Sequence, residues 1–113
     1  MNIAIVGSRT FTDYDLLLST IQKFKDEIDT IVSGGAAGAD SLGKRFADYW
    51  QIASIIFPAD WNKYGKSAGF RRNQHIVDYS DMVVAFWDGE SKGTKDTIEK
   101  ARVAKKPTFI VYF

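Results

Sequence analysis

The chain has 113 residues, which fits one domain and leaves too little material for a second hydrophobic core. Its composition, 45% hydrophobic and 26% charged, is that of an ordinary globular protein. The net charge of +1 argues neither for nor against a nucleic-acid partner. The absence of cysteine excludes disulfides and thiolate metal sites, and with no leader and no membrane-spanning run we expect a cytoplasmic protein without a membrane partner.

Short apolar runs alternate along the chain with segments of helical period, which predicts alternating strands and helices. Strands are expected at 3–6, 30–32, 54–57, 82–87 and 107–113, and helices at 13–24, 40–50, 68–79 and 94–105. Thr12 is expected to cap the first helix, and the segment 59–66 is expected to be a loop.

This alternation with short connections predicts a single Rossmann-like α/β domain over residues 1–113. It would have three layers around a parallel five-stranded sheet in the order 3-2-1-4-5. Ligands bind such sheets at the carboxyl ends of the strands, where the winding reverses. We therefore expect the loops after Val6, Val32 and Trp87 to meet at one edge and form a pocket.

The first of these loops contains Gly7, Ser8 and Arg9. They offer close backbone approach, a hydroxyl group and a guanidinium group that can form forked contacts with phosphate. A tight turn with a solvated arginine is the alternative interpretation.

The second loop is rich in glycine and leads into a helix, so that its backbone N–H groups are available to an anion. Its candidate ligand-binding residues are Ser33, Gly34, Gly35, Ala36, Gly38 and Asp40. Asp40 is expected either to cap the helix or to accept a hydrogen bond from a ribose hydroxyl. Close packing of helix against sheet is the alternative explanation for the glycines.

The third loop contributes Asp88, Gly93 and Thr94 as candidates, with Thr94 acting either as an N-cap or as a phosphate ligand. Neither the GxGxxG fingerprint nor the GxxxxGK[ST] motif occurs in the chain. Dinucleotide binding of the usual kind and P-loop nucleotide hydrolysis are therefore unsupported.

The segment from the third strand into the third helix adds Asp60, Trp61, Tyr64, Arg72 and Asn73 as candidates. Aromatic rings can stack on a base while cations contact phosphate. A stacking platform for single-stranded nucleic acid and a solvated basic loop are the alternatives. The lone histidine, His75, has no partner for a metal site, and we expect neither a metal nor a cofactor.

Six motifs together resemble the SLOG superfamily, most closely its small YspA-type, YpsA-related branch. They are GSRTFTD (7–13), SGGAAGAD (33–40), FPADWNKYGKSAG (57–69), RN (72–73), SDMVVAFWDG (80–89) and GTKDTI (93–98). The resemblance covers nearly the whole chain. It implies a small-molecule, nucleotide-like ligand and a homodimer or higher homo-oligomer.

The Lonely Guy phosphoribohydrolases of this superfamily use a glutamate that would fall at Thr97. A threonine cannot act as a carboxylate base, so we expect the protein to bind its ligand, as a sensor or a sequestering protein, rather than cleave it. An N-glycosidic hydrolase is the alternative, with Arg72 and Asp96 as candidate catalytic residues. The DNA-processing protein A group, also similar, binds single-stranded DNA, which makes nucleic-acid binding a second alternative.

Overall fold

The computed structural model describes residues 1–113 and contains one parallel sheet in the order β3-β2-β1-β4-β5. Its strands are β1 (Asn2–Gly7), β2 (Thr30–Ser33), β3 (Ala53–Ile56), β4 (Met82–Trp87) and β5 (Thr108–Tyr112). In the central strand, Ala4 is in register with Val32 on one side and Val83 on the other. The predicted fold class and strand order are confirmed.

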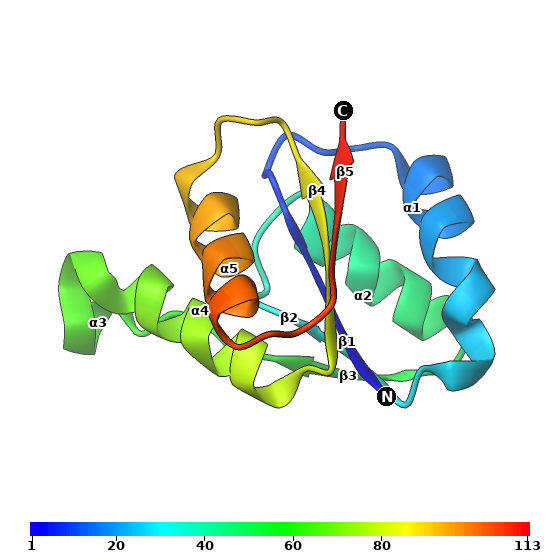
Figure 1. Ribbon diagram of the computed structural model, residues 1–113, viewed down its shortest axis with the longest axis horizontal. Helices are drawn as coiled ribbons and strands as arrows, with labels where there is room; N and C mark the ends of the chain where they lie inside the picture. Colours follow the sequence, from blue (N-terminus) through cyan, green and yellow to red (C-terminus); the bar gives the residue numbers. More distant parts are fainter.

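Helices cover both faces of this sheet, with α1 and α2 on one side and α4 and α5 on the other (Figure 1). The α-helices are α1 (Tyr14–Ile21), α2 (Ala39–Tyr49), α3 (Trp61–Tyr64), α4 (Ala68–Tyr79) and α5 (Lys92–Val103). Two 3₁₀ segments, η1 (Gln22–Glu27) and η2 (Gly65–Ser67), follow α1 and α3. None of these helices has the length and apolar character that crossing a membrane would require.

The core is divided by the sheet into two apolar clusters. Ile3 and Ile5 of β1 belong to the cluster that contains Phe46 of α2. Ala4 and Val6, which alternate with them, belong to the other cluster, with Ile76 of α4. Because alternate residues of a strand face opposite sides, a strand buried on both faces must be apolar throughout. This explains the uninterrupted apolar run of β1.

Two of the predicted helix starts are wrong. The N-cap of α1 is Asp13, not Thr12, and its Oδ1 accepts from the Leu16 N–H at 3.0 Å. A carboxylate also complements the positive end of the helix dipole, which favours Asp13. Likewise α5 starts at Lys92, two residues earlier than expected, because Ser91 rather than Thr94 is its N-cap. The α-helical part of α1 ends at Ile21, and the tighter 3₁₀ geometry common at helix C-termini replaces the expected continuation to residue 24.

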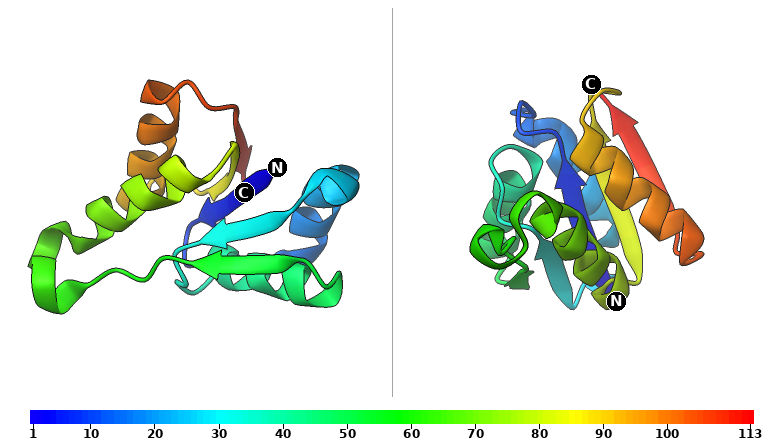
Figure 2. Two further views of the ribbon diagram at one scale, coloured as in Figure 1. Left: turned by 90° about the horizontal axis from the view of Figure 1, so that it is seen from below. Right: turned by 90° about the vertical axis from the view of Figure 1, so that its left-hand side faces the viewer.

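The expected loop at 59–66 is instead a helical arm, residues 61–67, formed by α3 and η2. It projects from the body of the domain beyond the carboxyl ends of the strands (Figure 2). Asp60 caps α3 by accepting from the Lys63 N–H at 3.1 Å, and Gly65 ends it with φ +56°. No residue of the arm is buried. The arm therefore depends on local caps rather than on the core.

Candidate functional site

A cleft of about 490 Å³ opens at the carboxyl-terminal edge of the sheet, within the size range of small-molecule sites. It is bounded by the loops after β1, β2 and β4, by the arm and by the start of α4. The predicted site residues that line it are Gly7, Ser8, Arg9, Ala36, Asp40, Trp61, Arg72, Asn73, Asp88, Gly93 and Thr94.

Ser8 joins the three loops at the floor of the cleft. Its N–H donates to the Phe86 carbonyl of β4 at 2.9 Å, and its own carbonyl accepts from the Ala39 N–H at 3.5 Å. Its hydroxyl accepts from the Asp88 N–H at 3.2 Å. The side chain is 2% exposed. Ser8 therefore links the three loops, which meet at one edge of the sheet as expected.

Several backbone N–H groups at the cleft have no acceptor within the protein. Those of Arg9 and Thr10 make no intramolecular hydrogen bond, and the same holds for Gly93 in the first turn of α5. A free amide in the first turn of a helix, as at Gly93, combines with the positive end of the helix dipole to attract anions. The guanidinium group of Arg9 is exposed beside them.

Asp40 takes up two of the backbone N–H groups of the glycine loop after β2. Oδ2 of Asp40 accepts from the Gly34 N–H at 3.0 Å and from the Ala36 N–H at 3.2 Å. Burial raises the pKa of Asp40 to about 6, although these two hydrogen bonds and the nearby Arg72 act in the opposite direction. Asp40 therefore fastens its own loop, which is a role the sequence did not suggest.

Close packing explains at least one glycine of this loop. Gly38 has φ +79°, and a Cβ there would overlap the Ser8 carbonyl oxygen. Only glycine adopts this conformation without strain, and only glycine allows this contact. At Gly38 the close packing is against the loop after β1 rather than between helix and sheet.

Six predicted residues do not line the cleft. Ser33 and Gly35 line a separate hollow of about 270 Å³ beside β3. Asp60 is the cap of α3, and the ring of Tyr64 lies under the Arg71 guanidinium at 4.5 Å. The other two residues are Gly34 and Gly38, whose backbones support the loop.

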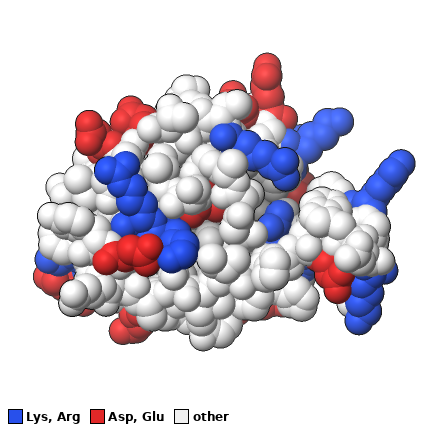
Figure 3. Space-filling view, turned by 180° about the vertical axis from the view of Figure 1, so that it is seen from behind, with Lys and Arg blue, Asp and Glu red and all other residues white.

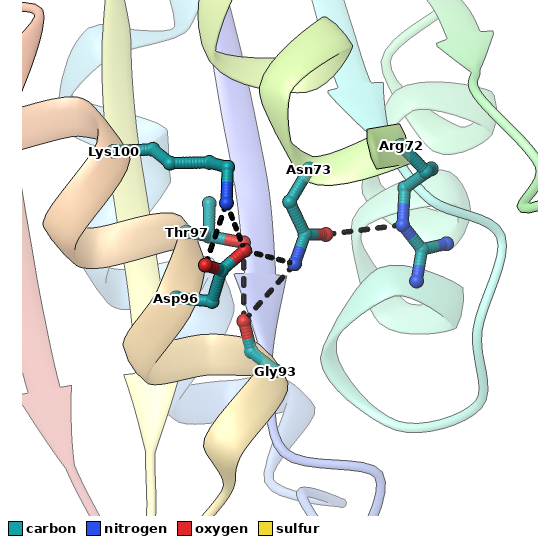
Figure 4. A network of polar contacts seen from close by, with 6 residues as sticks. All are labelled: Arg72, Asn73, Gly93, Asp96, Thr97 and Lys100. Atoms are coloured by element: carbon teal, nitrogen blue, oxygen red, sulfur yellow. Dashed lines mark hydrogen bonds and ion pairs between the residues drawn. The ribbon is translucent and has the colours of Figure 1, made fainter. Parts of the chain in front are cut away.

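Arg72 reaches from α4 across to the loop after β2. Its Nη1 donates to the Gly34 carbonyl at 2.9 Å, and its Nε donates to Oδ1 of Asn73 at 3.0 Å (Figure 4). Burial lowers the pKa of Arg72, while the neighbouring Asp40 raises it. Nη2 makes no hydrogen bond within the protein. The Arg72 guanidinium group is therefore fixed by hydrogen bonds at Nε and Nη1, and Nη2 remains available to a ligand.

The outer part of the cleft is aromatic and basic. Trp61 is 55% exposed and Phe70 is 48% exposed, although both line the cleft with Lys66. The lobe that contains the arm lies at the right of Figure 3 and carries several blue side chains, whereas both charges are scattered over the rest of this face. The arm therefore carries a local excess of cations that the net charge of +1 for the whole chain does not reveal.

The cleft is also lined by residues that were not among the candidates, including Gly69, Phe70 and Ser91. A helical-spacing signal could have found some of them. Gly69 and Phe70 precede Asn73 by four and three residues on α4, and Ser91, Thr94 and Thr97 follow one another at intervals of three. Residues spaced in this way share one face of a helix.

The other carboxylates at or near the cleft have different surroundings. Asp96, a candidate catalytic residue, lies outside the cleft lining and contacts Lys100 at 2.6 Å. The pKa of Asp88 is lowered by hydrogen bonds from the Ser91 and Glu90 N–H groups. No cluster of three or more His, Asp or Glu side chains gathers in a way that could hold a metal ion.

Comparison with known proteins gives a consistent classification. Residues 1–64 match the family described as YspA, cpYpsA-related SLOG. The Gene 61 protein of Mycobacterium phage D29 is 31% identical over 115 residues, which covers 93% of this chain and 91% of the phage protein.

Two solved structures share the fold at low sequence identity. DNA processing protein A from Streptococcus pneumoniae matches 96% of this chain with a TM-score of 0.82 and 20% identity. DNA processing protein A from Helicobacter pylori, described for its single-stranded DNA binding mode, matches 97% with a TM-score of 0.75 and 21% identity. This chain spans 49% and 64% of those two longer chains, respectively.

Proposed function

Because this chain belongs to the YspA, cpYpsA-related SLOG family, we propose that its cleft binds a nucleotide or nucleotide-derived ligand through a phosphate group. The observation that carries the proposal is the meeting of two arginines with free backbone amides in one cleft. The guanidinium groups of Arg9 and Arg72 approach it, as do the unpaired N–H groups of Thr10 and Gly93. Cations and oriented amides together form the usual setting for phosphate.

The other end of the cleft suits a base. Trp61 and Phe70 present exposed ring surface there, and Lys66 of the arm lines the same cleft. Aromatic rings stack on any base, and a cation nearby adds to the attraction. We propose holding rather than cleavage, because Asp96 is outside the cleft and Asp40 is engaged by two backbone amides.

Binding of nucleoside monophosphates and of the matching nucleosides, measured by calorimetry, tests this function. We expect the monophosphate to bind more tightly than the nucleoside. Arg72→Ala should weaken monophosphate binding about tenfold or more, the loss of a charge-assisted contact. Arg71→Ala is the matched control, because Arg71 is on the same helix but its Nε donates to Ser67 and its guanidinium covers Tyr64.

Equal affinity for nucleoside and monophosphate would refute the phosphate role. Chromatography of the nucleotide after incubation distinguishes holding from cleavage. Release of free base by the unaltered protein, lost in Arg72→Ala, would favour the N-glycosidic hydrolase instead.

Single-stranded nucleic acid is a second candidate ligand, favoured by the exposed rings and cations of the arm. Trp61, Tyr64 and Lys63 are all exposed on this projecting segment. The H. pylori neighbour of the same fold is described as a single-stranded DNA binder. Under this function, one bound nucleic-acid strand would contact both the base-stacking arm and the cleft.

Fluorescence anisotropy with a labelled oligothymidylate separates the two candidates. A DNA-binding function predicts affinity that falls steeply with salt, with a log–log slope of about −0.7 per phosphate contacted. It also predicts that Lys63→Ala, outside the cleft lining, weakens oligonucleotide binding and leaves mononucleotide binding unchanged. No binding at low salt would exclude this candidate.

A further inference from the structure

We propose that Asn73, oriented by Asp96, is a positioning residue that fixes the Arg72 guanidinium group for contact with the ligand's phosphate. This inference rests on the proposed function, since it assigns Arg72 to the phosphate. It gives Asn73 a different role from the direct ligand contact that the sequence suggested.

The surroundings of Asn73 determine which way its side-chain amide faces. Nδ2 lies 3.2 Å from the Gly93 carbonyl oxygen and 3.1 Å from Oδ2 of Asp96. Both groups only accept hydrogen bonds, so the amide nitrogen must face them and Oδ1 must face the other way. Oδ1 then accepts from Nε of Arg72 at 3.0 Å (Figure 4). A flipped amide would lose all three bonds.

Asn73 has no donor left for a ligand. Both hydrogens of Nδ2 are used, and the side chain is 6% exposed, so water does not readily replace these partners. Its carbonyl oxygen is directed at Arg72 and would repel a phosphate. Asn73 therefore acts through Arg72 and not on the ligand.

Two fixed nitrogens determine the orientation of the whole guanidinium plane. Nε of Arg72 is held by Asn73, and Nη1 is held by the Gly34 carbonyl at 2.9 Å. Since the group is planar and rigid, these two bonds also fix the direction of Nη2, which has no partner in the protein. A long side chain that would otherwise sample many rotamers is ordered before the ligand arrives.

Asp96 is itself held in place by Lys100. Both carboxylate oxygens accept from Nζ of Lys100, at 2.6 and 2.7 Å. The pair is partly buried, with side chains 23% and 20% exposed for Lys100 and Asp96. The chain of contacts runs from α5 through Asn73 of α4 to the loop after β2. It gives Asp96 a role although Asp96 lies outside the cleft.

The first test follows the Arg72 Nε–H group by ¹⁵N NMR in the protein without ligand. We expect a signal protected from hydrogen exchange in the unaltered protein, and its loss in Asn73→Ala. The matched control is Gln74→Ala, because Gln74 is the next residue, carries an amide and bonds only Asp78 at 2.8 Å on the exposed side of α4. An unchanged Arg72 signal in a folded Asn73→Ala protein would overturn the proposal.

Asp96→Asn provides a second variant that keeps the side chain's size. An amide at this position can present a hydrogen as well as an oxygen, so it no longer dictates how Asn73 faces. We expect a weaker and faster-exchanging Arg72 signal. Asp48→Asn is the control, because it breaks the equivalent exposed pair with Lys44 on α2. If both variants leave Arg72 unchanged, Asp96 does not orient Asn73.

The second test is a double-mutant cycle on the affinity for adenosine monophosphate, with adenosine as the comparison. Asn73→Ala should weaken monophosphate binding about tenfold and leave adenosine binding unchanged. In the Arg72→Ala background it should have no further effect, since Asn73 acts through Arg72. A loss that persists in that background would overturn the positioning role.

The two tests separate the failure of this inference from the failure of the proposed function. Absence of binding to any nucleotide by the unaltered protein would refute the proposed function and the phosphate contact. The NMR test needs no ligand, and its outcome still decides whether Asn73 and Asp96 hold Arg72.

Discussion

Asp40 shows how one buried side chain can hold a loop in place beside the cleft. It is 6% exposed and accepts hydrogen bonds from two N–H groups of the glycine loop, while Arg72 of α4 provides a nearby positive charge. Burial is the largest influence on its pKa and disfavours the charged form. The same carboxylate that organises the loop is therefore costly to ionise in the folded protein.

This cost predicts a pH dependence of stability. The pKa of Asp40 is about 6 in the folded protein and 3.8 in the reference state, so the folded protein holds this proton more tightly. The stabilising contribution of the protonated form is complete below the reference pKa of 3.8, and it is lost as pH rises through the folded-state pKa of about 6. Between about pH 4 and pH 7, the free energy of unfolding relative to Asp40→Asn should fall by up to about 3 kcal/mol.

Urea denaturation across this pH range measures the difference. Asp48→Asn serves as the control, because Asp48 is an exposed carboxylate on the same helix. A difference between the unaltered protein and Asp40→Asn that stays constant with pH would contradict the prediction.

At the scale of the elements, the cleft depends on how closely β1, β4 and α2 approach one another. Gly7 ends β1 at this point, and a Cβ there would overlap the Phe86 carbonyl oxygen and lie 2.7 Å from Cβ of Ala39. Its neighbour Ser8 then bonds to both β4 and α2. The absence of a side chain at Gly7 is thus a condition for the three elements to meet.

Gly7→Ala should therefore destabilise the fold by about 1–3 kcal/mol, the usual cost of overpacking. Gly93→Ala is the comparison, because a Cβ at Gly93 meets nothing within 4 Å and alanine is the better helix former. Denaturant unfolding of both variants measures the effect. Equal stability of the two would show that the elements can separate to admit a methyl group.

At the scale of the whole molecule, a well-packed sheet contrasts with a projecting arm. β1 and β4 are nearly completely buried, whereas residues 61–67 contain no buried side chain. Trp61 and Lys66 nevertheless line the cleft. Homo-oligomerisation, which the family resemblance implied, stays a prediction at this scale.

Hydrogen exchange should separate the two regions. Amides of the arm should exchange through local opening, while those of β1 and β4 should require global unfolding. Saturating adenosine monophosphate should slow exchange in the arm if the ligand contacts Trp61 and Lys66. Mass spectrometry of peptides covering each region measures this. An arm as protected as β1 in the free protein would contradict the expectation.

Much of the architecture could be predicted because it depends on residue patterns that are local and repeated. The apolar run of β1 indicated a strand covered on both faces, and parallel topology required the loops after β1, β2 and β4 to share an edge. The arm could not be predicted in this way. Only four residues lie between Asp60 and Gly65, too few for a periodic signal, although a capping aspartate and a terminating glycine bracket them.

The sequence by itself determined the α/β class, the strand order, the family resemblance and most residues that line the cleft. Only the tertiary structure decided what those residues do there. Asp40 takes up two of the backbone N–H groups of the glycine loop, and the carbonyl oxygen of Asn73 is bonded to Arg72 rather than free for a ligand. The physical reason is that a strand or helix follows from neighbouring residues. Which donor meets which acceptor depends on groups brought together from α4, α5 and the loop after β2.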